Sequence, residues 1–254
     1  MHGLRGEAGM SDKEEPEHYS IEDVEKCQKN AIRLYKDALN TSIPTKAALI
    51  ELGIEELSKG IILLANIPKP NLDPVLKELI NLNSDSDLLS SLDSLKKYNF
   101  KKFDMFDHKR KLKIIEDIFK SLGLVYPQSE RITAALLNIM RPTFGTVDDK
   151  QTAKFDDVIS DINRFNFRDL YKIKENGFYV NFIGNKVVSP MEQDLKTEEI
   201  TGIFSVLYIP LNILVEIYKG TQFTSIFSDA KLILGDLYDL LSEVSKNNLG
   251  REER

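Results

Sequence analysis

Apolar residues recur at intervals of three and four along most of the chain, the spacing that places them on one face of an α-helix. The first stripe follows Ser20, a residue type that caps helix starts, and runs to Ala38. The second runs from Pro44 to Leu64, and the third spans residues 101–123. Further patterns predict helices at residues 75–82, 88–98, 129–140, 148–174, 197–218 and 221–246.

One segment, residues 178–188, has the pattern of a β-hairpin instead. Aromatic and β-branched residues lie on both sides of a Gly184–Asn185 turn, and Pro190 ends the segment. A two-stranded hairpin is only marginally stable by itself. We therefore expect it to dock on the helices and not to join a larger sheet.

The fold class that these patterns predict is all-α, an antiparallel helical bundle with extra helices and one small β-hairpin. One domain is expected over residues 19–246, with a core at about 20–125 and additional helices and the hairpin at 126–246. Residues 1–18 and 247–254 are expected to form a flexible arm and a flexible tail. A chain of 254 residues can bury such a core without a disulfide or metal.

Charge and cysteine content limit the binding partners and the cellular location that are expected for the protein. A net charge of −6 argues against attraction of the whole protein to nucleic acid or to an anionic membrane. The one cysteine, Cys27, lies on the first apolar stripe and cannot form an internal disulfide. With no apolar signal segment in residues 1–17, the cytoplasm is the expected location. Residues 200–215 are uncharged but too short to span a membrane, and are expected to form a buried core helix.

A dense basic run crosses the third helix. Residues 96–113 carry eight lysines and arginines against two aspartates, in a chain that is acidic as a whole. Such a run is either a surface that binds phosphate groups or an ordinary solvated helix face.

His108 lies on the apolar stripe of that helix, so the pattern places it toward other helices. A buried imidazole needs a hydrogen-bond partner, and Asp104 and Lys111 lie one turn away on either side. Such a histidine can transfer protons near neutral pH. The alternative is a core histidine whose hydrogen bonds are satisfied.

The second helix carries a polar stripe with Glu51, Glu55 and Lys59 spaced four apart, and Glu56 beside it. By itself this pattern is also typical of a surface ion pair. Phosphate-loop, serine-hydrolase and dinucleotide fingerprints are missing from the sequence, and no metal or cofactor is expected.

Three segments together resemble a known family. The first is the run Ala31 to Ala38, which leads into the second-helix run Ala48 to Gly60. The others are the segment Phe106-Asp107-His108-Lys109-Arg110-Lys111-Leu112 and the segment Lys174 to Asn181 that is followed by Pro190. In this order they resemble the AbiV family of abortive-infection proteins, a branch of the HEPN helical superfamily. The resemblance implies a HEPN-like bundle, often dimeric, that acts in defence against viruses.

Many HEPN proteins are metal-independent endoribonucleases, and the resemblance implies site residues of that kind. The expected catalytic set is His108, Lys59, Glu55 and Lys111, in which Glu55 orients Lys59 and the lysines stabilise charge on the phosphate. The expected nucleic-acid contacts are Lys101, Lys102, Lys109 and Arg110. The usual HEPN arginine before the histidine is absent, since residues 101–107 contain no arginine.

Two functions therefore stay open at this point. In the first, the chain is an antiviral protein that binds or cleaves RNA, with RNA as partner and a homodimer as the assembly. In the second, it is a non-enzymatic helical module that binds a viral or host protein, and the same polar residues form a structural network. Neither DNA nor a membrane is an expected partner.

Overall fold

The structure is a computed structural model that describes residues 19–68, 92–98, 108–121, 167–184, 186–190, 197–220, 229, 232, 233, 235 and 236. The predicted helices at 75–82 and 129–140, most of those at 148–174 and 221–246, and the arm and tail lie outside the described residues. Five helices and one two-stranded antiparallel sheet make up the described part, which confirms the all-α prediction.

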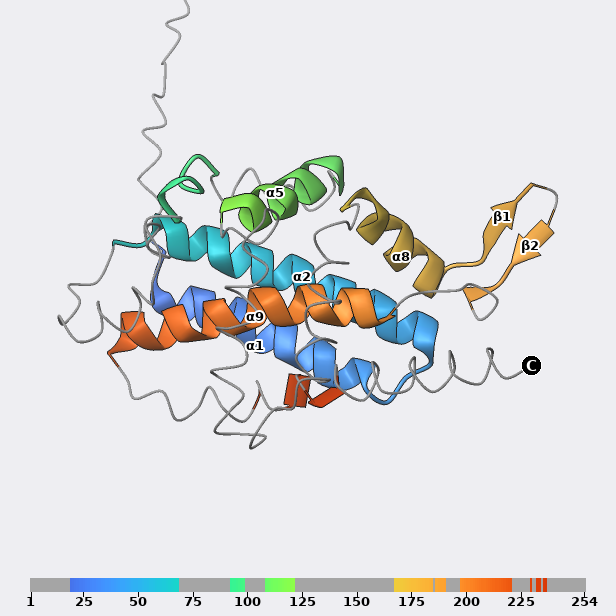
Figure 1. Cartoon of the computed structure of the whole chain (residues 1–254), viewed down its shortest axis with the longest axis horizontal. Helices are drawn as coiled ribbons and strands as arrows, with labels where there is room; N and C mark the ends of the chain where they lie inside the picture. The colour runs from blue at the N-terminus through green and yellow to red at the C-terminus, as the bar shows by residue number, and fades with distance from the viewer. Residues whose placement is uncertain are drawn as a thin grey trace, which may run out of the picture.

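The first two helices form an antiparallel pair. α1 (Ile21–Ala38) begins where the sequence predicts, and the Ser20 backbone N–H donates to the Asp23 carboxylate at 3.2 Å, a typical helix-start contact. α2 (Ile43–Asn66) follows after a four-residue connection. It has Pro44 in its first turn, where the missing N–H of proline costs nothing. Figure 1 shows the two helices lying along each other.

α9 (Thr197–Lys219) packs in the groove between these helices and runs parallel to α2. The packing is tight at Gly53, where a Cβ atom would lie 2.7 Å from the Phe204 ring. Pro210 lies inside α9, and the helix continues through it without a break. α9 is long and apolar enough to cross a membrane, but 89% of its most apolar stretch is buried inside the protein, so it is the core helix that the sequence predicts.

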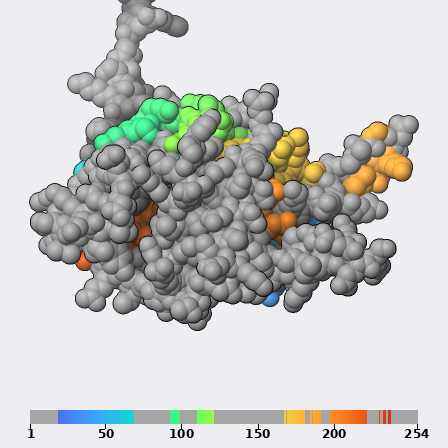
Figure 2. Space-filling model, in the orientation of Figure 1, coloured from blue at the N-terminus to red at the C-terminus, as the bar shows by residue number. Residues whose placement is uncertain are grey.

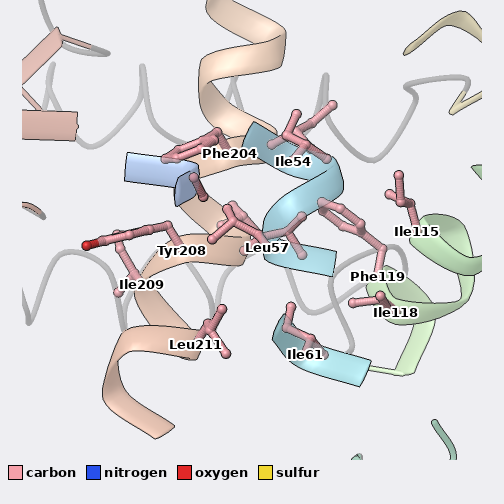
Figure 3. Packing of buried hydrophobic residues seen from close by; sticks show 14 of the residues in the cluster. Ile54, Leu57, Ile61, Ile115, Ile118, Phe119, Phe204, Tyr208, Ile209 and Leu211 are labelled. Carbon is pink, nitrogen blue, oxygen red and sulfur yellow. The ribbon is translucent and has the colours of Figure 1, made fainter. Parts of the chain in front are cut away.

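The opposite side of α2 is covered by two shorter helices, α5 (His108–Ser121) and α8 (Arg168–Phe178). Figure 3 shows α2 in the middle of the core, with α9 on one side and α5 on the other. Its side chains Ile54, Leu57 and Ile61 are at most 1% exposed. α2 therefore contacts every other described helix, and it contributes side chains to the core on two sides.

The hairpin consists of β1 (Asn181–Ile183) and β2 (Lys186–Val188), which pair antiparallel around the predicted turn. It forms no larger sheet within the described chain, as expected. The expectation that it docks on the bundle is wrong for the side chains described, because Val180 and Val187 are 55% and 62% exposed. Figures 1 and 2 show it projecting beyond the end of α8.

Candidate functional site

α5 begins at His108 and lies against α2. The apolar spacing puts Leu112, Ile115 and Phe119 on one stripe with His108. The buried face differs from this stripe: Lys111, Ile114 and Ile118 are buried together with Ile115 and Phe119, whereas Leu112 is only partly buried. The helix is thus turned so that a lysine lies at the centre of the face that meets α2. The side chain of His108 lies outside the described residues, as does Asp104, so the predicted inward orientation of the histidine is not tested.

The partner of Lys111 is Glu55 of α2. The Lys111 Nζ atom lies 3.0 Å from Glu55 Oε2, and the two side chains are 6% and 9% exposed. A second lysine, Lys174 of α8, donates to the other carboxylate oxygen at 2.6 Å. Burial by itself would raise the pKa of Glu55, but hydrogen bonds and charge from Lys174 and Lys111 outweigh it and lower that pKa. Glu55 is therefore an ionised carboxylate that joins three helices.

Glu51 lies one turn before Glu55 and is 1% exposed. Its Oε2 atom is 3.5 Å from Lys174 Nζ, yet it has no hydrogen-bond partner in the described part of the chain. Burial, followed by the neighbouring charge of Glu55, raises the pKa of Glu51 to about 8. Both effects favour the protonated, neutral form of Glu51. Glu51, Glu55, Lys111 and Lys174 are called the Glu55 cluster below.

The cluster is a buried polar junction between α2, α5 and α8. With Glu51 protonated, it holds one carboxylate and two ammonium groups. An unpaired buried charge is costly, whereas a charge-assisted hydrogen bond in a dry site is strong, so the cluster fixes which faces of the three helices meet. It can also hold or release one proton, at Glu51.

Lys59 does not belong to this cluster. Its ammonium pairs with Glu56 on the same helix, and the two side chains are 12% and 20% exposed. The expectation that Glu55 orients Lys59 is therefore wrong: the carboxylate points to α5 and α8, and Glu56 takes the lysine. The physical reason is that Glu55 already has a lysine on each oxygen.

Much of the described basic run is paired with acids. Lys96 lies 2.8 Å from Asp93, and Lys113 lies 3.1 Å from Asp117, which also has Lys97 at 3.5 Å. Arg110 is exposed. Lys101, Lys102 and the side chain of Lys109 lie outside the described residues, so the predicted phosphate surface is not tested.

Lys174 is the site residue that sequence reasoning missed. The sequence contains a pattern that indicates a buried lysine here. Lys174 shares one helix face with Leu170, Ile173 and Gly177, which puts it among apolar positions. Lys111 has the same relation to Ile114 and Ile118. Each lysine interrupts an apolar face opposite the two glutamates of α2, and the reading of these glutamates as a surface pair is wrong.

The described residues hold no group of three or more His, Cys, Asp or Glu side chains that could bind a metal ion. Neither a curated protein nor a solved structure matches the chain. A family model described as AbiV, of the HEPN_AbiV family, matches residues 20–200, which is most of the chain and includes α1, α2, α5, α8 and the hairpin. The chain therefore belongs to the AbiV family of abortive-infection HEPN proteins.

Proposed function

We propose that this protein acts in antiviral defence by cleaving RNA without a metal ion, with His108 as the proton-transfer residue. The observation that carries the proposal is the position of His108. It is the first described residue of α5, three residues before Lys111, whose buried pair with Glu55 fixes that helix to α2. A histidine on a helix that is anchored in this way, and in a basic segment of the sequence, is suited to acid–base chemistry on a phosphodiester.

The reaction that fits is attack of a ribose 2′ oxygen on the adjacent phosphorus. The bond from phosphorus to the 5′ oxygen breaks, a base takes the 2′ proton, and an acid gives a proton to the leaving oxygen. His108 can serve in either step, and in a homodimer two His108 residues could serve in both. Lys101, Lys102, Lys109 and Arg110 would hold the phosphate.

The structure changes the expected role of one lysine. Lys111 is 5% exposed and donates to Glu55, so in this proposal it holds α5 in place and does not contact phosphate. Lys59, paired with Glu56, is a candidate phosphate contact only if that pair opens.

The test is incubation of purified protein with structured and unstructured RNA, with and without EDTA. The wild type should cleave RNA in both conditions. His108→Gln should abolish cleavage at an unchanged melting temperature, because glutamine keeps polarity but cannot exchange a proton near pH 7. His18→Gln, which lies before the matched family region, is the control and should cleave normally. An active His108→Gln protein would refute the assignment.

RNA binding is tested separately from cleavage. Lys102→Glu combined with Arg110→Glu should weaken binding and flatten its salt dependence, since fewer counterions are released. The control makes the same charge change on α1, where Lys26 and Lys29 are 75% and 73% exposed. Equal affinity and salt slope in the two double variants would show that residues 101–113 are not the RNA surface.

A second candidate function is a non-enzymatic module that binds a viral or host protein. The burial of Glu51, Glu55 and Lys111 favours it, because a sealed polar cluster contributes to packing whether or not a reaction takes place. Protection against virus infection separates the two functions. Protection that survives His108→Gln supports the binding module, and protection lost together with cleavage supports the enzyme.

A further inference from the structure

We propose that Lys174 and Glu51 are positioning residues for α5: they hold the Glu55 carboxylate in the orientation that receives Lys111, and so set where the start of α5 lies relative to α2. The inference deepens the proposed function, since it concerns the placement of His108, and it rests on that function for its catalytic consequence.

Each carboxylate oxygen of Glu55 accepts a hydrogen bond from a lysine. Oε2 receives Lys111 at 3.0 Å and Oε1 receives Lys174 at 2.6 Å. A glutamate held through one oxygen can still turn about its terminal bond, whereas one held through both from different helices cannot turn without breaking a charge-assisted bond. Without Lys174, the pair that anchors α5 would therefore lose its fixed direction.

The backbone position of Lys174 is fixed by the packing of α8 on α2. It lies three residues before Gly177, where α8 meets α2 so closely that a Cβ atom would lie 2.3 Å from the Pro44 carbonyl oxygen. The backbone of α8 is thus set against α2 by packing, independently of the ion pairs. Lys174 reaches Glu55 from this fixed helix, with its side chain 13% exposed.

The protonation state of Glu51 decides whether Lys174 has one carboxylate partner or two. Among the described residues, the charged groups that face Glu51 are Glu55 of its own helix and Lys174 of α8, and Lys111 of α5 reaches the group through Glu55. While Glu51 is neutral, Lys174 has one anionic partner and stays on Glu55. When Glu51 ionises, a second carboxylate 3.5 Å from the Lys174 ammonium competes for it.

The experiment follows the imidazole of His108 by NMR in the protein without RNA. The chain has three histidines, and the signal that His108→Gln removes identifies the one of interest. Lys174→Met keeps the apolar stem and removes the charge. It should fold, because Glu55 and Lys111 remain a balanced pair. Lys174→Arg tests rescue. Lys172→Met, two residues away and 70% exposed, is the matched control.

Lys174→Met should shift the His108 signal and its titration curve, and Lys174→Arg should restore much of both. Lys172→Met should match the wild type. RNA cleavage should fall roughly tenfold in kcat with little change in KM, as expected for a displaced catalytic group. A Lys174→Met protein with a lower melting temperature but an unchanged His108 signal and kcat would overturn the proposal, since Lys174 would then be merely structural.

If Lys174→Met does not fold, a pH titration of the His108 signal in the wild type tests the proposal instead. Between about pH 6 and pH 9.5 the His108 signal should show a second step, from the ionisation of Glu51, beyond its own titration. Glu51→Gln stays neutral at every pH and should lack that step. The same curve in both proteins would overturn the role of Glu51. A wild type that shows the step but cleaves no RNA would refute the proposed function and leave the positioning intact.

Discussion

At the scale of single residues, the most informative feature is that lysines and glutamates occupy positions that the apolar pattern reserves for the core. Glu55 and Lys111 are each less than 10% exposed, and each has an oppositely charged partner. A buried carboxylate or ammonium group without a partner would be neutralised or would destabilise the fold. Glu55 can therefore stay buried and ionised only beside an ammonium group, and Lys111 can stay buried only beside a carboxylate.

Glu55→Gln tests this dependence. The amide cannot balance two ammonium groups, so we expect a loss of about 3–5 kcal/mol in the free energy of unfolding, measured by urea denaturation at pH 7. Glu116→Gln, which removes a 35%-exposed carboxylate that pairs with Lys120, is the control and should cost under about 1 kcal/mol. Equal losses in the two variants would show that Glu55 makes no special contribution.

The free energy of unfolding should depend on pH through Glu51 in the opposite direction to its dependence through Glu55. Its pKa in the folded chain, about 8, lies above its ordinary value of 4.5, so folding favours the protonated form. Its contribution to stability is complete below about pH 4.5 and is lost as the pH rises to about 8. Between pH 5 and pH 8.5 we expect the wild type to lose on the order of 1–3 kcal/mol more than Glu51→Gln.

Thermal and urea unfolding of both proteins at several pH values give this difference. Glu55, whose pKa is lowered, acts in the other direction: its stabilisation is present above its ordinary value and is lost in acid. Parallel stability curves for the wild type and Glu51→Gln would mean that Glu51 is already ionised at pH 7.

At the scale of elements, α8 continues further than its sequence suggests. The pattern predicts a helix that ends near Lys174 and a strand that starts at Phe178, but the helix runs through Gly177 to Phe178. Glycine usually favours a helix end, and here it is kept inside the helix because only a residue without a side chain fits against Pro44 and Ala48. Phe178, Tyr179 and Val180, which are expected in the first strand, lie instead at the exit from the helix and are exposed.

Gly177→Ala should therefore destabilise the protein, by about 1–3 kcal/mol, because the methyl group would meet backbone that cannot move aside. Gly235→Ala is the matched control. Gly235 is also helical, and a Cβ atom there would have nothing within 4 Å, so alanine should be neutral or stabilise by up to about 1 kcal/mol. Chemical denaturation of both variants measures the difference. A Gly177→Ala protein as stable as Gly235→Ala would show that α8 can shift on α2.

At the scale of the whole molecule, polar bonds link the end of the described chain back to its beginning. Asp236 accepts from the buried Tyr35 hydroxyl at 2.6 Å and from Lys46 at 2.8 Å. Asp229 accepts from Lys36 at 2.9 Å and from the buried Tyr208 hydroxyl at 3.0 Å. Both aspartates lie beyond residue 200, where the match to the AbiV family ends, whereas Tyr35, Lys36 and Lys46 lie within the matched region. Two buried tyrosines thus take their hydrogen-bond acceptors from this C-terminal segment.

Replacing both acceptors should loosen that segment. Asp229→Asn combined with Asp236→Asn keeps the shape but removes two charges, and should cost roughly 2–4 kcal/mol if the four bonds act together. Limited proteolysis should then cut the chain after Gly220 at lower protease concentration, before the bundle itself unfolds. Asp37→Asn, at an exposed pair with Arg33, is the control and should leave both readouts unchanged. Cleavage at equal rates would mean that the aspartates do not hold the segment.

The sequence by itself determined the kind and the approximate position of the main elements in the described part of the chain. Helices over 21–38, 43–66 and 197–219 follow from apolar spacing, because a helix must bury one stripe and that stripe is visible in the chain. The hairpin turn follows from Gly184, which adopts a positive φ of 61° that other residues avoid. The family also follows from sequence, through the order of its motifs.

Only the tertiary structure decided which charges are paired. Lys111 and Lys174 lie 63 residues apart, and Glu55 is 56 residues from the first of them, so no local spacing connects them. Sequence reasoning assigns a lysine to water because burial alone is unfavourable, and it pairs Glu55 with Lys59 because they are close in sequence. The pairing of Glu55 depends on which helix faces meet. Because α2, α5 and α8 meet at one point, each buried charge has an oppositely charged partner there and is stable.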